Sequence, residues 1–259
     1  MRDALLGFGI VLGVQFAVPS FVISADAANL ETIRARGYLI VAVKDNRRPL
    51  GFLDENGQLV GYEIDIARQL ADALLGDAEA VELRPVANDD RLAAVLSGEV
   101  DVAIAGLAVT PARERIVSFS VPYYLDGTGL ITRLPTIRTV QDLTRRTIAV
   151  LSASDAVPAV GYLLPQANLL GVESYHAAHE SLERDRADAF AGDITILTGW
   201  QQADPSYRLL PEVLTVAPLA IALPKGNQHA ELRRAINAAL VTWHNDGWLE
   251  ERATAWGLP

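Results

Sequence analysis

The segment DVAIAGLAVTPARERIVSFSVPYY, residues 101–124, carries the pattern from which the rest of the chain is interpreted. Residues 102–105 form an apolar run that predicts a buried strand. Gly106 follows this run, where the absence of a side chain lets the backbone approach another group closely. In open α/β sheets ligands bind at the carboxyl ends of strands, so a binding residue is expected shortly after this point.

A short helical turn follows, and it carries the first candidate binding residue. Thr110 precedes Pro111, which suits the first position of a helix, so that Arg113 falls in the first turn. An arginine fixed beside a strand end and a threonine hydroxyl can bind a carboxylate through two parallel hydrogen bonds. The ordinary alternative is a surface arginine paired with Glu114.

Strand and helix patterns alternate on both sides of this segment. Before it, strands are predicted at residues 38–43 and 81–86 and from residue 100, with helices at 64–74 and 91–96. After it, strands are predicted at 147–151, 168–175 and 188–192, with helices at 154–163, 177–184 and 194–202. One long helix is predicted for residues 231–256. This order indicates an α/β fold in which parallel sheets carry helices on both faces.

Composition limits the class of function. The chain has 259 residues, half of them hydrophobic, which suffices for two lobes with substantial cores. The formal net charge of −10 argues against nucleic acid and against docking on anionic lipid. The sequence contains no cysteine, which excludes disulfides, thiolate metal sites and cysteine nucleophiles. Neither a nucleophile elbow nor a phosphate-binding loop is present, and we expect no catalysis, metal or cofactor.

The N-terminal segment has the features of an export signal. Residues 4–23 carry no charge, and small residues at 24–28 offer a cleavage site after Ala27. An apolar run of this length can also span a bilayer, so an uncleaved anchor remains the alternative. Either interpretation places the remainder outside the cytoplasm, in the periplasm.

The pattern T-x-x-R followed by F-S-x-P-Y-Y, at residues 110–113 and 119–124, resembles the signature of the polar-amino-acid solute-binding proteins of ABC importers. Similar segments run from Tyr38 to Leu258. The resemblance implies two lobes, each a mainly parallel sheet flanked by helices, joined by two hinge crossings near residues 123–127 and 217–221 and closing on a ligand. The implied divisions are residues 1–28 (signal or anchor), 29–125 (first lobe), 126–218 (second lobe) and 219–259 (return to the first lobe).

The resemblance also implies which residues hold the two α-groups of a free amino acid. Arg113 binds the α-carboxylate, with Thr110, the backbone at Ala108 and the hydroxyl of Ser154 as neighbours. Asp193 takes the α-ammonium. From the residues alone, Ser154 is equally well explained as an ordinary helix N-cap. Asp193 is explained as the N-cap of the helix from Ile194, a role that it could combine with ligand binding.

The side-chain pocket departs from the commonest family pattern, because Arg47 replaces an aromatic residue there. The motif V-K-x-x-x-x-P-x-G-F, together with V-x-x-x-x-R-L, is more similar to the members that bind glutamate, aspartate and their amides. Those members have a basic residue and an arginine that reach the distal carboxylate or amide of the ligand. Lys44 and Arg91 occupy the corresponding positions here, with Asn88 as a possible hydrogen-bond partner. A set of neighbouring acids could neutralise these cations and favour a neutral or basic ligand: Asp45, Asp89, Asp90 and, in the facing lobe, Asp155.

The function implied by the resemblance is binding of one polar amino acid, acidic or amide, and its delivery by a monomer to an ABC permease. Two alternatives remain. The first is a cyclohexadienyl or arogenate dehydratase on the same fold, which would need an acid able to protonate a leaving hydroxyl. The second is the ligand-sensing domain of a receptor. Tyr175 and His176 fall where the second lobe could also contact a ligand side chain.

Overall fold

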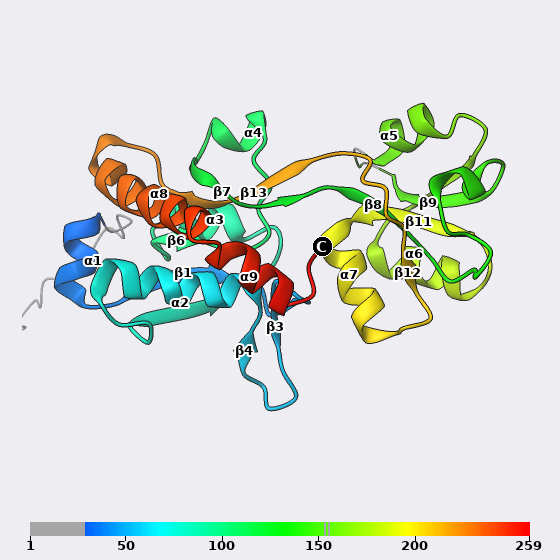
Figure 1. Cartoon of the computed structure of the whole chain (residues 1–259). Helices are drawn as coiled ribbons and strands as arrows, with labels where there is room; N and C mark the ends of the chain where they lie inside the picture. Colours follow the sequence, from blue (N-terminus) through cyan, green and yellow to red (C-terminus); the bar gives the residue numbers. More distant parts are fainter. Residues whose placement is uncertain (1–28, 153, 155) are drawn as a thin grey trace, which may run out of the picture.

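The computed structural model describes residues 29–152, 154 and 156–259, which form two lobes joined by a pair of long strands (Figure 1). The predicted export signal or anchor, residues 1–28, lies outside these described residues. None of the helices in the described part combines the length and the apolarity that a membrane crossing requires.

The first lobe contains a five-stranded sheet with the strand order β5-β1-β6-β13-β7. β1 is parallel to β5 and β6, and β13 is antiparallel to both β6 and β7, so four of the strands share one direction. The strands are β1 (Leu39–Val43), β5 (Val81–Pro85), β6 (Val102–Ala103), β7 (Ser118–Asp126) and β13 (Ala217–Leu223). A small antiparallel sheet projects from this lobe and consists of β2 (Asn46–Arg47), β3 (Gly51–Leu53) and β4 (Leu59–Val60) (Figure 1).

Helices cover both faces of this sheet. They are α1 (Leu30–Arg36), α2 (Tyr62–Leu75), α3 (Arg91–Leu96), α4 (Pro111–Glu114), α8 (Ala230–Asn245) and α9 (Trp248–Ala255), with a 3₁₀ turn at Asn227–His229. Successive side chains of a strand point to opposite faces, so β1 contributes to two cores. Leu39, Val41 and Val43 pack in the cluster that includes α2 and α8, whereas Ile40 and Ala42 pack in the cluster that includes α3.

The C-terminal region differs from the single helix predicted for residues 231–256, because it forms two helices, α8 and α9. Gly247 separates them in a left-handed conformation with φ of 80°, which a glycine adopts without steric cost. The backbone N–H of Trp248 donates to the Asp246 carboxylate at 3.0 Å. The bend brings the rings of Trp243 and Trp248 to 5.3 Å between centroids. The apolar spacing continued across the break, and therefore gave no sign of it.

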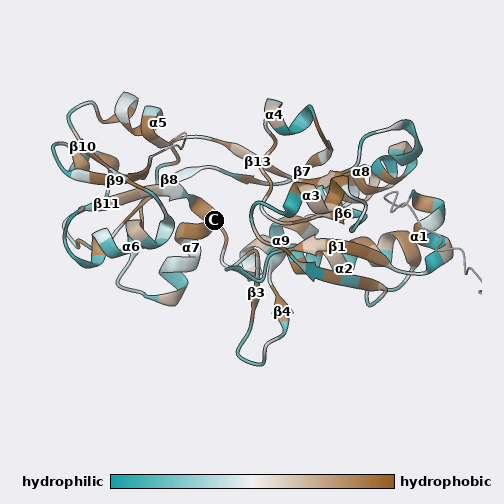
Figure 2. Cartoon of the chain, turned by 180° about the vertical axis from the view of Figure 1, so that it is seen from behind, coloured by the Kyte–Doolittle hydropathy of each residue, from teal (hydrophilic) through white to brown (hydrophobic). Residues whose placement is uncertain are grey.

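The second lobe repeats the α/β arrangement around a sheet with the order β10-β9-β11-β8-β12. β9, β10 and β11 are parallel, and β8 is antiparallel to its neighbours β11 and β12. Its strands are β8 (Thr128–Thr132), β9 (Thr147–Leu151), β10 (Asn168–Val172), β11 (Ala189–Asp193) and β12 (Arg208–Leu209). Its helices are α5 (Ala156–Leu163), α6 (Tyr175–Glu183) and α7 (Ile194–Ala203), with a 3₁₀ turn at Val140–Leu143. In both lobes, hydrophobic residues concentrate in the strands and on the inner faces of the helices (Figure 2).

The long strands β7 and β13 carry the chain between the lobes (Figure 1). They pair in an antiparallel manner, with Tyr124 opposite Leu219 and Asp126 opposite Ala217. The pairing continues to the point where both strands leave the first lobe, so the lobes are connected by one two-stranded ribbon.

Candidate functional site

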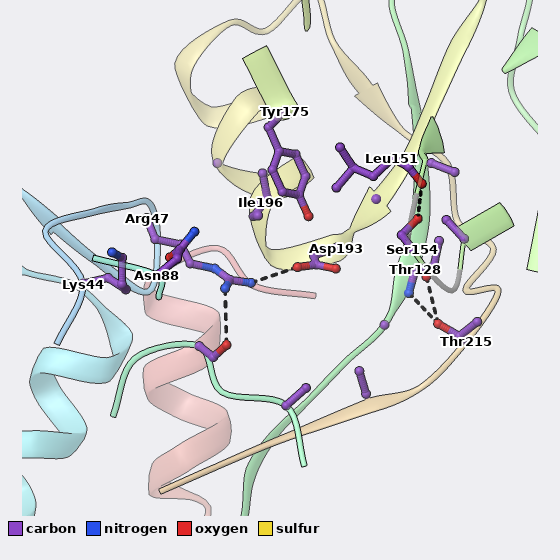
Figure 3. Close-up of a pocket in the computed structure, with 18 of the residues that line it drawn as sticks. Lys44, Arg47, Asn88, Thr128, Leu151, Ser154, Tyr175, Asp193, Ile196 and Thr215 are labelled. Carbon is purple, nitrogen blue, oxygen red and sulfur yellow. Dashed lines mark hydrogen bonds and ion pairs between the residues drawn. The ribbon is translucent and has the colours of Figure 1, made fainter. Parts of the chain in front are cut away.

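A cavity of about 1050 Å³ lies between the two lobes. Its position follows from the topology, because the carboxyl ends of parallel strands in each lobe meet there. Lys44 directly follows β1, and Asp193 is the last residue of β11 (Figure 3). All nine residues named from the sequence line this cavity: Lys44, Arg47, Asn88, Arg91, Ala108, Thr110, Arg113, Ser154 and Asp193. Their individual roles in binding stay predictions.

Arg113 is oriented by the two neighbours that the sequence indicated. The Thr110 hydroxyl caps α4 by accepting a hydrogen bond from the backbone N–H of Arg113 at 3.3 Å. The guanidinium of Arg113 donates to the carbonyl of Ala108 at 2.7 Å through Nη1. Among the described residues no carboxylate forms an ion pair with Arg113, so the predicted alternative of pairing with Glu114 is not observed. The remaining guanidinium donors can therefore hold a carboxylate that enters the cavity.

Lys44 and Arg91 form a cationic wall in the first lobe. Lys44 is 3% exposed, and its Nζ donates to the carbonyl of Val86 at 2.5 Å. Arg91 donates to the carbonyls of Asn88, Ala105 and Gly106 at 2.8, 2.9 and 3.1 Å. Burial lowers the pKa of Lys44, and the nearby charge of Arg91 lowers it further. Burial likewise lowers the pKa of Arg91, with Arg47 and Arg113 adding to the effect. An anion placed among these cations would relieve their mutual repulsion.

Three acids that could have neutralised this wall lie elsewhere. Asp45, Asp89 and Asp90 do not line the cavity, and none of them forms an ion pair with another described residue. The charge of Asp45 does act on Lys44, but it is a weaker influence than burial and Arg91. Asp155 lies outside the described residues. The alternative of neutralisation by these neighbours is therefore unsupported for the three described acids.

Asp193 contacts a residue of the opposite lobe. It occupies the N-cap position of α7, but its side chain makes no capping hydrogen bond, so the expectation that the carboxylate caps the helix is wrong. Instead its Oδ2 lies 3.2 Å from Nη2 of Arg47 (Figure 3). Arg47 also donates to the hydroxyl of Thr195 at 3.2 Å and lies 3.7 Å from the carboxylate of Asp126. The carboxylate of Asp193 is 48% exposed, which leaves room for a second partner.

Ser154 and Asn88 line the cavity from different lobes. The hydroxyl of Ser154 donates to the carbonyl of Leu151, the last residue of β9, at 2.9 Å. Helix α5 begins two residues later, so Ser154 belongs to the turn before the helix. Asn88 is exposed and labelled in Figure 3 on the same side as Lys44. Neither side chain is committed to a structural ion pair, and each retains an acceptor for a ligand.

Helix α7 supplies lining residues that the sequence interpretation missed. Ile196, Gly199, Trp200 and Ala203 line the cavity from one face of this helix. Their spacing of three and four residues, counted from Asp193, is the signal that could have identified this face. Tyr175 also lines the cavity, as the sequence suggested, whereas His176 does not.

A buried acid beneath the cavity was also missed. Glu63 of α2 is fully buried, and its Oε1 accepts hydrogen bonds from the backbone N–H of Gly106 at 2.7 Å and from the hydroxyl of Tyr123. Burial raises the pKa of Glu63, although Tyr123, Arg47 and Arg91 oppose the rise. Glu63 thus holds the loop after β6 at the base of the site.

Comparisons with known proteins agree with the resemblance that the sequence motifs indicated. Residues 39–259 match the family model described as bacterial extracellular solute-binding proteins, family 3. The glutamine-binding protein of Geobacillus stearothermophilus is 34% identical over 206 residues, which cover 78% of this chain and 78% of that protein. The L-cystine-binding protein TcyJ of Escherichia coli K12 is 26% identical over 260 residues, covering 98% of this chain and 95% of that protein.

Solved structures extend the similarity to three dimensions. The ancestral cationic amino acid solute-binding protein AncCDT-1 aligns with a TM-score of 0.72 at 29% identity, covering 88% of this chain and 98% of the other. A further AncCDT-1 structure, described as a precursor of cyclohexadienyl dehydratase, aligns with a TM-score of 0.68 at 29% identity, over 88% of this chain and 98% of the other. The expected fold class of two α/β lobes is confirmed by these matches together with the two sheets described above.

Proposed function

Because the chain belongs to the bacterial extracellular solute-binding proteins, family 3, we propose that it binds one polar amino acid outside the cytoplasm and delivers it to the permease of an ABC transporter. Relatives are named for different amino acids, glutamine and L-cystine among them. The family therefore supports amino-acid binding in general, and the side chains that line this cavity set the preference for one amino acid.

The observation that carries the proposal is the placement of Arg113 and Asp193 in one cavity between the lobes. Arg113 has free guanidinium donors for an α-carboxylate, and Asp193 has carboxylate surface left for an α-ammonium. A zwitterion needs both charges satisfied before it can leave water. Residues from both lobes contribute, so a ligand bound by both would favour closure of the lobes around it.

The side chain of the ligand would face the cations of the first lobe. Lys44 and Arg91 lie in that wall, and the described lining includes five cationic side chains but a single acid, Asp193. We therefore favour an acidic side chain, or its amide, over a basic or apolar one. The absence of Asp45, Asp89 and Asp90 from the described lining supports this preference.

The dehydratase alternative is supported by similarity to AncCDT-1. That chemistry needs a protonated acid aimed at a leaving hydroxyl. The acid among the described lining residues is Asp193, and its carboxylate is engaged by the guanidinium of Arg47 at 3.2 Å. The cavity thus favours binding over elimination.

We further propose that the protein acts as a monomer and that residues 1–28 direct its export.

A thermal-shift screen of the purified protein with each of the twenty amino acids, and with prephenate, tests the function. A ligand present at about a hundredfold its dissociation constant stabilises the folded state by about 2.7 kcal/mol, so glutamate, aspartate or an amide is expected to raise the melting temperature. Isothermal titration calorimetry then measures the affinity. Conversion of prephenate during incubation would instead support the enzyme, and no response to any amino acid would refute the proposal.

A further inference from the structure

Arg47 reaches from the first lobe into the second. It lies on the short strand β2, yet its guanidinium contacts residues at the start of α7: Nη2 lies 3.2 Å from Asp193 Oδ2 and 3.2 Å from Thr195 Oγ1 (Figure 3). The side chain is 13% exposed. The interaction is therefore partly shielded from solvent, where a charge pair is stronger than at an open surface.

The same guanidinium lies between two acids. Asp126 Oδ2 is 3.7 Å from Nη2, on the side of Arg47 that faces the crossing strand β7. Asp126 already accepts hydrogen bonds from the N–H groups of Gly127 and Thr195 at 2.9 and 3.2 Å and from the Thr195 hydroxyl at 2.7 Å. Asp126 is thus occupied by its own surroundings, and Asp193 is the acid that Arg47 shares with the cavity.

This pairing changes what Asp193 offers to a ligand. A ligand ammonium at Asp193 would lie beside a permanent positive charge that already uses one carboxylate oxygen. The other described cations of the lining are Lys44, Arg48, Arg91 and Arg113. A second cationic group on the ligand would therefore be repelled by these positive charges. A second anionic group would instead be attracted to them and would reduce the repulsion among them.

Arg47 also has an unused donor. Its Nε is buried and has no hydrogen-bond partner among the described residues, and its Nη1 has only a long contact of 3.4 Å with the carbonyl of Gly106. A buried guanidinium N–H without an acceptor costs free energy, so the pair with Asp193 is the main polar contact that holds this side chain. The guanidinium lies directly against Gly106, where a Cβ atom would overlap it.

We propose that Arg47 is a specificity-determining residue that pairs with Asp193, excludes ligands with a basic side chain and attracts the acidic side chain of the ligand through its positive charge. The inference rests on the proposed function and sharpens it: the ligand class is amino acids with two carboxylates, preferred over their amides. Arg47 thus serves both as a counter-charge for Asp193 and as part of the side-chain pocket.

The test is calorimetric measurement of glutamate, glutamine and arginine binding to the wild-type protein and to Arg47→Met. We expect the variant to lose at least about tenfold in affinity for glutamate relative to arginine, as for the loss of one partly shielded charge pair. Arg48→Met is the matched control, because it removes the same charge from the adjacent cavity residue. The guanidinium of Arg48 stacks on Phe52 at 3.8 Å and makes no ion pair with another described residue.

Using a ratio of affinities cancels any general loss of folded protein. If Arg47→Met leaves the glutamate-to-arginine ratio unchanged, or changes it no more than Arg48→Met does, the inference is wrong while the proposed function stands. If the wild-type protein binds none of the twenty amino acids, the proposed function itself fails. A double variant with Asp193→Asn adds a further check: the effect of Arg47→Met on arginine binding should shrink when Asp193 carries no charge.

Discussion

Glu63 on helix α2 accepts a hydrogen bond from the hydroxyl of Tyr123 on the crossing strand β7. The same carboxylate oxygen accepts the backbone N–H of Gly106 at 2.7 Å. One buried acid thereby joins a helix of the first lobe, the loop at the base of the cavity and the strand that leads to the second lobe.

The first prediction concerns the pH dependence of stability. Burial raises the pKa of Glu63 above its ordinary value of 4.5, so the folded protein retains this proton at pH values where the unfolded chain has released it. The free energy of unfolding then falls as the pH rises from about 4.5 through the raised pKa of Glu63. The total loss is about 1.4 kcal/mol for each unit by which folding raises this pKa. Glu63→Gln should abolish that loss, and urea unfolding at several pH values measures it. The exposed Glu79→Gln should retain the wild-type profile, and parallel profiles for all three proteins would contradict the prediction.

The second prediction concerns the carboxylate site. Arg113→Ala should weaken binding of the identified amino acid by about 2–5 kcal/mol, because a carboxylate in a desolvated cavity would lose its charged partner. Titration calorimetry measures the change. Arg115→Ala, which removes an exposed arginine two residues further along the chain, is the matched control and should bind as the wild type does. Equal affinities for the wild type and Arg113→Ala would remove Arg113 from the site.

The third prediction concerns Lys44. Burial, then the charge of Arg91, lowers its pKa from 10.5, while Asp45 opposes the shift and Arg47 adds to it. Its charge is therefore lost at a lower pH than that of a free lysine, and binding of an anionic side chain should draw a proton back. Glutamate affinity should fall as the pH rises through this lowered pKa, with proton uptake visible as a dependence of the binding enthalpy on the buffer.

Glutamine supplies the reference for this measurement, because its α-ammonium titrates as that of glutamate does. The ratio of glutamate to glutamine affinity should decrease as the pH rises toward 10.5, the ordinary pKa of a lysine, in the wild type. In Lys44→Met the ratio should be smaller at neutral pH and flatter across the range. A ratio that does not change with pH in the wild type would show that Lys44 does not face the distal group.

The fourth prediction uses two glycines in similar conformations. Gly106 and Gly76 have φ of 61° and 79°, so alanine at either position introduces left-handed strain of about 1–2 kcal/mol. A Cβ at Gly76 has nothing within 4 Å, whereas at Gly106 it lies 2.9 Å from Cζ of Arg47. Because the guanidinium can move aside only by giving up its contacts with Asp193 and Thr195, Gly106→Ala should lose more stability than Gly76→Ala in urea unfolding. Only Gly106→Ala should lower the ratio of glutamate to arginine affinity, and a ratio equal to that of Gly76→Ala would contradict the role given to Arg47.

Local patterns predicted the parallel strands β1, β5, β6, β9, β10 and β11 because each follows from its own residues, whereas β7, β8, β12 and β13 were not predicted as strands. Leu39, Val41 and Val43 alternate with Ile40 and Ala42, and this run predicts a strand buried on both faces without reference to distant residues. The break at Gly247 was missed for the complementary reason. The apolar spacing on both sides of it is compatible with one helix, and the packing of Trp243 against Trp248 becomes apparent only in three dimensions.

The site residues also divide into those that a local pattern identifies and those that it does not. Arg113 and Thr110 are three residues apart, so a short motif could identify them and their mutual hydrogen bond. Arg47 and Asp193 are 146 residues apart and lie in different lobes. Each was named as a candidate, but no local pattern indicates that they pair. Glu63 was missed because an acid in the first turn of an amphipathic helix ordinarily faces solvent.

The position of helix α1 has a practical consequence. It lies at the outer end of the first lobe, on the side away from the second lobe (Figure 1). A support or fluorescent carrier coupled ahead of this helix would leave the mouth of the cavity facing free solution. The protein could thus be immobilised through its N-terminal side as the recognition element of an amino-acid biosensor.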